Sequence, residues 1–212
     1  MRKYLAIPLL SSLAFAAGAS FPDPTVGLDK PTVKTKQVAV FAGGCFWCTE
    51  AVFEGVIGVD KVVSGYAGGN ANDAEYRTVS EGRTQHAEAI EITYDASKIS
   101  FGQLLKVFFS VAHDPTTLNR QGPDHGTQYR SVVFYIGDDQ KRAVDAYVAQ
   151  LGKAGVLPGP IVTQIVPLKK FYSAEAYHQD FVRNNPGHGY VVVNALPKLK
   201  KLKQYYPELT KK

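Results

Sequence analysis

The chain has 212 residues and a formal net charge of +5, with 45% hydrophobic and 20% charged residues. These are ordinary values for a globular protein, and the length is that of a single domain with a core large enough to fold alone. The chain contains two cysteines, which excludes a zinc site built from two cysteine pairs.

The N-terminal residues resemble an export signal. Arg2 and Lys3 form a positively charged start, and residues 5–17 are apolar but too short to span a bilayer comfortably. Residues 17–19 read Ala-Gly-Ala, a typical cleavage site. An uncleaved anchor is the alternative, and no long apolar span supports it. We therefore expect residues 1–19 to be a signal peptide and the mature protein to be exported, either periplasmic or secreted.

The remaining chain divides by composition into three parts. Residues 20–36 contain three prolines and no periodicity, which is typical of a linker. Residues 37–196 are predicted to form the catalytic domain. Residues 197–212 carry six lysines and one glutamate; the simplest interpretation is a basic, solvated C-terminal tail.

The stretch 43–50, GGCFWCTE, contains both cysteines and the single tryptophan. It follows an apolar run at 38–42 that predicts a buried strand. Two glycines permit a sharp turn into a helix predicted to begin at Cys45. At the positive end of the helix dipole, Cys45 is expected to lose its proton more easily than an ordinary thiol. Cys48 lies one helical turn later, within disulfide reach.

The cysteine pair has two interpretations. A structural disulfide is the commoner use of two cysteines in an exported protein. A bond between Cys45 and Cys48 would close a very short loop, however, and the stabilisation that a disulfide provides grows with loop length. A redox-active pair is the preferred hypothesis.

Residues 86–94 alternate in the manner of a strand. His86, Glu88, Ile90, Ile92 and Tyr94 share one face, and the three large apolar side chains mark it as the core side. A carboxyl group on such a face resists ionisation, so the pKa of this glutamate should be raised. Two roles remain open at this point: an acid catalyst, or a structural partner of an arginine such as those at 83 and 130. An edge position at which Glu88 reaches water is a further alternative.

The other predicted elements alternate between helices and strands. A capping box at Ser100 and Gln103 begins a helix over 100–112, and residues 113–130 form a long polar loop without recognisable metal-ligand spacing. Further elements are predicted as follows: strands at 59–66, 131–136 and 161–166, and helices at 138–151 and 173–181. This order favours an α+β fold with the architecture of a two-layer α/β sandwich.

Four motifs together resemble the class A peptide methionine sulfoxide reductases: GCFW at 44–47, YR at 76–77, HAEA at 86–89 and GTQYR at 126–130. The resemblance extends from about residue 37 to about residue 189. It implies a ferredoxin-like core with long functional loops. It also implies the reduction of methionine S-sulfoxide, free or in proteins, without a metal or organic cofactor.

The resemblance assigns a role to each matching residue. Cys45 would be the nucleophile, Cys48 the resolving thiol, and Glu88 the acid for the sulfoxide oxygen. The other matching residues would bind the substrate: hydroxyl donors to the oxygen from Tyr76 and Tyr129, an apolar pocket for the methyl group from Phe46 and Trp47, and a contact at the pocket edge from Asp124.

The resemblance further implies a thioredoxin-like reductant that reopens the disulfide. The expected substrates are oxidised proteins and free methionine S-sulfoxide. Nucleic-acid binding and stable membrane insertion are not expected, and the protein is predicted to be a monomer. Two other classes compete: a general thiol–disulfide oxidoreductase, and a secreted binding module with a passive disulfide. Neither explains Glu88 on the core face or the loop that contains Asp124.

Overall fold

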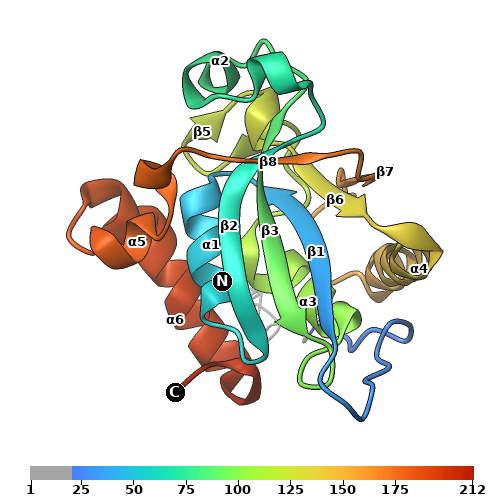
Figure 1. Ribbon diagram of the computed structural model, residues 1–212. Coiled ribbons are helices and arrows are strands. Elements are labelled where there is room, and N and C mark those ends of the chain that lie inside the picture. The colour runs from blue at the N-terminus through green and yellow to red at the C-terminus, as the bar shows by residue number, and fades with distance from the viewer. Residues whose placement is uncertain (1–20) are drawn as a thin grey trace, which may run out of the picture.

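A computed structural model describes residues 21–212 and is built on a six-stranded sheet (Figure 1). The strand order is β7-β6-β1-β3-β2-β8, and every neighbouring pair is antiparallel except β6 and β7. The strand bounds are β1 Lys36–Gly43, β2 Val59–Ala67, β3 Ala87–Asp95, β6 Ser131–Tyr135, β7 Gln164–Pro167 and β8 Phe171–Ser173. The predicted signal peptide, residues 1–19, lies outside the described residues.

The central four strands and two helices form a ferredoxin-like unit. Helix α1, Phe46–Glu54, connects β1 to β2, and helix α3, Phe101–Val107, connects β3 to β6. The four strands are ordered β6-β1-β3-β2, which is the split βαβ arrangement with β3 between β1 and β2. The predicted α+β class, two-layer sandwich and ferredoxin-like core are confirmed.

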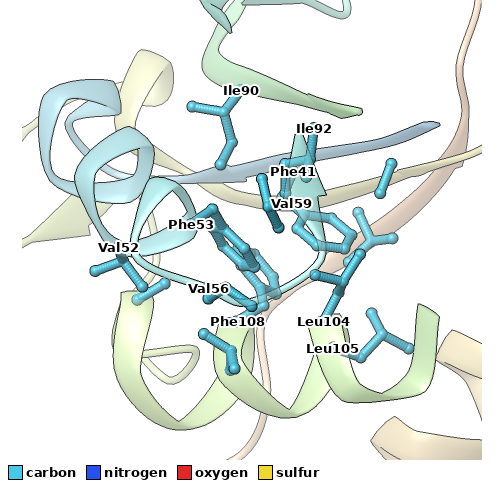
Figure 2. Close-up of a cluster of buried hydrophobic side chains, with 14 of the residues drawn as sticks. Phe41, Val52, Phe53, Val56, Val59, Ile90, Ile92, Leu104, Leu105 and Phe108 are labelled. Carbon is cyan, nitrogen blue, oxygen red and sulfur yellow. The ribbon is translucent and has the colours of Figure 1, made fainter. Parts of the chain in front are cut away.

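The main hydrophobic core fills the space between this sheet and its helices (Figure 2). Phe41 comes from β1, and Ile90 and Ile92 come from β3; all three are fully buried. They meet Phe53 of α1 and Leu104 of α3. Alternation along the strands and the helical apolar stripe place these side chains in one layer, as the periodicity predicts.

The helices predicted at 100–112 and 138–151 are present, with bounds close to those expected. The Gln103 amide donates to Ser100 Oγ at 3.2 Å, and the Ser100 amide donates to Gln103 Oε1 at 3.1 Å, which is the predicted capping box. Helix α3 then continues as a π-helical turn over Phe108–Ala112. Helix α4 spans Gly137–Ala154 and packs against α3 and β6.

The predicted helix at 173–181 is wrong. Phe171–Ser173 is the edge strand β8, paired with β2; Ala176–His178 is a 3-10 turn, and the α-helix α5 begins at the end of the predicted segment and spans Phe181–Asn184. Tertiary hydrogen bonds hold this segment in its irregular course: Gln179 accepts from the Ser64 amide at 2.9 Å and donates to the Ser64 carbonyl at 2.9 Å. The predicted strand at 161–166 begins three residues later, as β7.

The loop at 113–130 is ordered, with short structure of its own. Strands β4 (Arg120–Gln121) and β5 (Asp124–His125) form a small hairpin, and Thr127–Tyr129 is a 3-10 turn. Helix α2 spans Tyr76–Ser80 and is joined to this loop by a hydrogen bond from Gln128 Nε2 to the Ser80 carbonyl at 3.0 Å. These loops lie together at one end of the sheet (Figure 1).

The C-terminal residues are not a solvated tail. Helix α6, Leu196–Tyr205, buries Leu202, and beyond the helix Tyr206 and Leu209 also join the core. These apolar positions recur every three or four residues, so one face of the segment packs while Lys200 and Lys203 remain exposed. Near the other end of the chain, Pro22 accepts a hydrogen bond from the Tyr147 hydroxyl of α4 at 3.0 Å. No helix within residues 21–212 is long and apolar enough to cross a membrane.

Candidate active site

Cys45 occupies the corner between β1 and α1, as predicted. Gly44 makes the turn with φ of +85°, and a side-chain Cβ there would lie 2.5 Å from Gln121 Cβ, so only glycine fits this corner. Cys45 is the N-cap of α1, and its carbonyl accepts from the Cys48 amide at 3.1 Å. Both cysteines are free thiols.

Glu88 is buried against this corner, with 2% of its surface exposed. Its Oε2 accepts a hydrogen bond from the Phe46 amide at 3.1 Å, which is the first free amide of α1. Burial raises the pKa of Glu88 to about 8; the charge of Asp124 adds to this shift and the Phe46 amide opposes it. The carboxyl group is therefore mainly protonated at neutral pH.

The two arginines that could have paired with Glu88 are engaged elsewhere. Arg83 Nη1 lies 3.9 Å from Glu81 Oε2, with which it forms a salt bridge. Arg130 donates to the carbonyls of Gln85 and His86 at 2.8 and 3.0 Å. No salt bridge among residues 21–212 includes Glu88, so the structural-pairing hypothesis lacks a partner.

The expectation that the helix end lowers the pKa of Cys45 is wrong. Burial raises this pKa well above its ordinary value, and the hydrogen bond with Cys48 and the charge of Glu88 raise it further. The helix amide that could have favoured the thiolate donates to Glu88 instead. The same hydrogen bond from Cys45 lowers the pKa of Cys48. In the resting pair the proton thus stays on Cys45, and Cys48 is the more readily ionised thiol.

Two tyrosine hydroxyls belong to the same environment. Tyr76 begins α2 and Tyr129 ends the 3-10 turn, and both are half-buried. Burial raises the pKa of each, and the nearby charge of Glu88 raises it further. Both hydroxyls therefore keep their protons and can donate hydrogen bonds. The backbone of Tyr76 is held by Glu175, whose Oε1 accepts from the Tyr76 amide at 2.8 Å.

Phe46 and Trp47 directly follow Cys45 in α1, and contacts with distant residues fix both side chains. The Trp47 indole stacks on Phe181, with ring centroids 3.7 Å apart and planes within 8°. Its Nε1 donates to His178 Nδ1 at 3.1 Å, and the His178 ring lies 5.0 Å from the Phe46 ring. Both aromatic residues are thus fixed by residues from the C-terminal third of the chain.

Sequence reasoning missed Tyr190 and His178. The Tyr190 hydroxyl donates to Asp124 Oδ2 and is within hydrogen-bonding reach of the Cys45 thiol. Tyr190 follows a glycine-containing turn outside the recognised motifs, and His178 lies within the wrongly predicted helix. An aromatic residue next to glycines was the only available signal, and it is a weak one.

A cavity of about 310 Å³ opens beside the two cysteines. The cavity lies on the side of the cysteine pair that faces α6, because Lys198 and Lys201 of that helix line it. Glu88, Tyr76 and Tyr129 do not line it. Charged and polar side chains line this cavity together with the two cysteines: His113, Asp114, Gln121, Asp124, Tyr190, Asn194, Lys198 and Lys201. No group of three or more potential ligands within residues 21–212 is arranged to hold a metal ion.

A half-buried thiol at a helix N-terminus, a second, buried thiol one turn away and a protonated carboxyl group are typical of a thiol-dependent oxidoreductase. Comparison with known proteins specifies the family. The family model described as peptide methionine sulfoxide reductase matches residues 37–210. The chain belongs to the peptide methionine sulfoxide reductase family.

Individual relatives agree with the family model. A peptide methionine sulfoxide reductase, MsrA 2, from Mesorhizobium japonicum is 56% identical over 86% of this chain and 93% of its own length. A protein of the same name from a Synechocystis strain is 48% identical over 98% of both chains. Both support class A of the family.

Solved structures agree with the fold. Reduced Mxr1 from Saccharomyces cerevisiae aligns with a TM-score of 0.64 at 34% identity, covering 76% of this chain and 91% of Mxr1. Methionine sulfoxide reductase A of Corynebacterium diphtheriae aligns with a TM-score of 0.61 at 31% identity, covering 79% and 87% of the two chains. The chain is therefore an oxidoreductase that reduces methionine sulfoxide.

Proposed function

We propose that Cys45 attacks the sulfoxide sulfur while Glu88 protonates the sulfoxide oxygen. The observation that carries this proposal is the buried Glu88 carboxyl, which has no cationic partner among residues 21–212 and accepts a hydrogen bond from the first amide of the helix that Cys45 caps. A sulfoxide sulfur becomes more electrophilic when its oxygen is protonated. A carboxyl group with a pKa of about 8 carries the required proton at neutral pH.

The step balances as a transfer of oxygen from the substrate to Cys45. The Glu88 proton goes to the sulfoxide oxygen, and the Cys45 thiol proton passes to the Glu88 carboxylate. Attack by Cys45 forms a bond to the substrate sulfur. The hydroxyl group then moves from the substrate sulfur to the Cys45 sulfur, and the sulfur–sulfur bond breaks with its electron pair left on the substrate, so methionine and a Cys45 sulfenic acid are the products. The raised pKa of Cys45 keeps its thiol protonated until the substrate oxygen accepts a proton.

The substrate groups are assigned to the surrounding side chains. Tyr76 and Tyr129 donate hydrogen bonds to the oxygen, and Phe46 and Trp47 enclose the S-methyl group. Asp124, held by the Tyr190 hydroxyl, contacts the substrate at the edge of the pocket. Donors fixed on one side of the sulfur and an apolar wall on the other favour one configuration, and we assign preference for the S epimer.

The sulfenic acid then condenses with Cys48. The Cys48 thiolate attacks the Cys45 sulfur, a disulfide forms and the oxygen leaves as water. A dithiol reductant of the thioredoxin type restores both thiols by two exchange steps. We propose that the enzyme acts on oxidised proteins and on free methionine S-sulfoxide, as a monomer.

An epimer assay tests this function. Purified protein with dithiothreitol receives the S or the R epimer of a methionine sulfoxide peptide in separate tubes, and methionine formation is measured. We expect product from the S epimer alone. Equal rates with both epimers would refute the assigned pocket, and no product with either would refute the chemistry.

We further propose that the protein is exported after removal of residues 1–19, on the basis of the leader pattern in the sequence. The mature N-terminus should lie at or near Ser20. Mass spectrometry of the natively expressed protein measures this directly. An intact N-terminal segment that includes Arg2 and Lys3 would overturn the proposal.

A further inference from the structure

Helix α6 places a cationic side chain beside the resolving cysteine. α6 lies alongside α1 (Figure 1), and the two helices share a small apolar cluster that includes Cys48, Ala195 and Leu199. Lys198 stands near the start of α6 and is half-buried. The helix that sequence analysis treats as a tail thus forms part of the wall around Cys48.

The Lys198 ammonium is held in one position. Its Nζ donates to the Ala112 carbonyl at 2.7 Å, where the π-helical turn after α3 ends. Lys198 and both cysteines line the same cavity. A cation fixed next to a thiol in a partly enclosed space favours the thiolate form of that thiol.

The hydrogen bond from Cys45 lowers the pKa of the Cys48 thiol, and Lys198 is the cation whose charge lowers it further. The hydrogen bond from Tyr190 also lowers it, whereas the charge of Asp124 raises it. His113 is buried, and its pKa is lowered to about 3 by burial, so it is neutral. Asp114 and Lys201 also line the cavity, but neither is among the groups that shift the pKa of Cys48.

We propose that Lys198 is a positioning residue for the second chemical step, in which Cys48 attacks the Cys45 sulfenic acid. The fixed ammonium stabilises the Cys48 thiolate and orients it within the cavity. Glu88 does not line the cavity that contains Lys198, so we expect the loss of this ammonium to affect the second step and not the proton transfer from Glu88 in the first. This inference rests on the proposed function, because it requires a Cys45 sulfenic acid.

The test separates the two steps in a single turnover without reductant. Methionine release reports the first step. Disulfide formation reports the second step. It is measured by quenching samples with an alkylating reagent and counting the free thiols by mass spectrometry. Four proteins are compared: wild type, Lys198→Gln, Lys198→Arg and the control Lys200→Gln, which removes the same charge from an exposed position on α6.

We expect Lys198→Gln to release methionine at the wild-type rate but to form the disulfide roughly tenfold more slowly at neutral pH, because the pKa of Cys48 rises when the neighbouring charge is removed. Its rate of disulfide formation should recover as the pH rises. Lys198→Arg should restore the wild-type pH profile, and Lys200→Gln should not change it. Glutamine can still donate to the Ala112 carbonyl, so loss of folding is not expected.

A wild-type pH profile of disulfide formation in Lys198→Gln would overturn the proposal. So would an equal shift in Lys200→Gln, which would indicate a general effect of the net charge. If methionine release itself fails in the wild-type protein, the proposed function is wrong rather than the role of Lys198. If Lys198→Gln does not fold, Lys198→Met serves in the same comparison.

Discussion

At the scale of single residues, the chemistry depends on Glu88 remaining protonated at neutral pH. Its neighbours explain why: the carboxyl group is buried, receives a single backbone hydrogen bond, and faces the charges of Asp124 and Cys48. Alternation along 86–94 predicts that Glu88 faces the core, because side-chain direction in a strand follows local sequence. The absence of an arginine partner could not be predicted, because it depends on where distant arginines fold.

Glu88→Gln tests the acid directly. Glutamine keeps the size and the hydrogen bond from the Phe46 amide but cannot deliver a proton. The rate of methionine release should fall roughly a hundredfold or more, while the circular dichroism spectrum stays unchanged. A near-wild-type rate in a well-folded variant would return Glu88 to a structural role.

The wild-type rate of the first step should also decline as the pH rises through about 8, the pKa of Glu88 in the folded protein. Above that pH the carboxyl group has lost the proton that it donates. A stopped-flow measurement of methionine release from pH 6 to 10 would show this fall. A first step that accelerates steadily across the whole range would instead indicate that ionisation of Cys45 limits the rate.

At the scale of elements, local patterns predict the strand at β3 and the capping box of α3 correctly. They fail where tertiary contacts decide the conformation. The segment at 173–181 has helix-forming residues, but Glu175 and Gln179 bond to β2 and to Tyr76 and so hold the chain in an irregular course. Tyr190 and His178 reach the site through that course, so they could not be placed from local sequence.

The packing of helix α6 gives a testable prediction at this scale. Leu202 is 1% exposed and packs in the main core. Leu202→Ala should lower the free energy of unfolding by about 2–5 kcal/mol, because it removes buried methyl groups and leaves a cavity. Lys203→Ala, at the adjacent exposed position, should change it by less than about 0.5 kcal/mol. Equal, small effects in urea denaturation would mean that the C-terminal segment is a solvated tail after all.

At the scale of the whole molecule, buried carboxyl groups link stability to pH. Burial raises the pKa of Glu88 to about 8 and the pKa values of Glu50 and Glu54 to about 7, from an ordinary value of 4.5. A carboxyl group with a raised pKa stabilises the fold fully below its unfolded value. That contribution is lost as the pH rises through the folded value, since the unfolded chain ionises first.

The Glu88 contribution can be isolated by difference. Between pH 4.5 and about 8, the stability of the wild type relative to Glu88→Gln should fall by roughly 1.4 kcal/mol per pH unit. Both proteins contain Glu50 and Glu54, whose effects cancel in the difference. Denaturation at several pH values measures it. A pH-independent difference would show that Glu88 has the same pKa in the folded and unfolded protein.

The division of labour between the two cysteines is the central claim, and one single-turnover experiment tests it most directly. Reduced wild type, Cys45→Ser and Cys48→Ser each receive methionine S-sulfoxide without reductant, followed by dimedone. Cys48→Ser should release about one methionine per enzyme and carry one dimedone adduct at Cys45, because its sulfenic acid has no resolving thiol. Cys45→Ser should release none, and wild type should release one while forming a disulfide without an adduct. Loss of the first turnover in both variants, or an adduct at Cys48, would contradict the assignment.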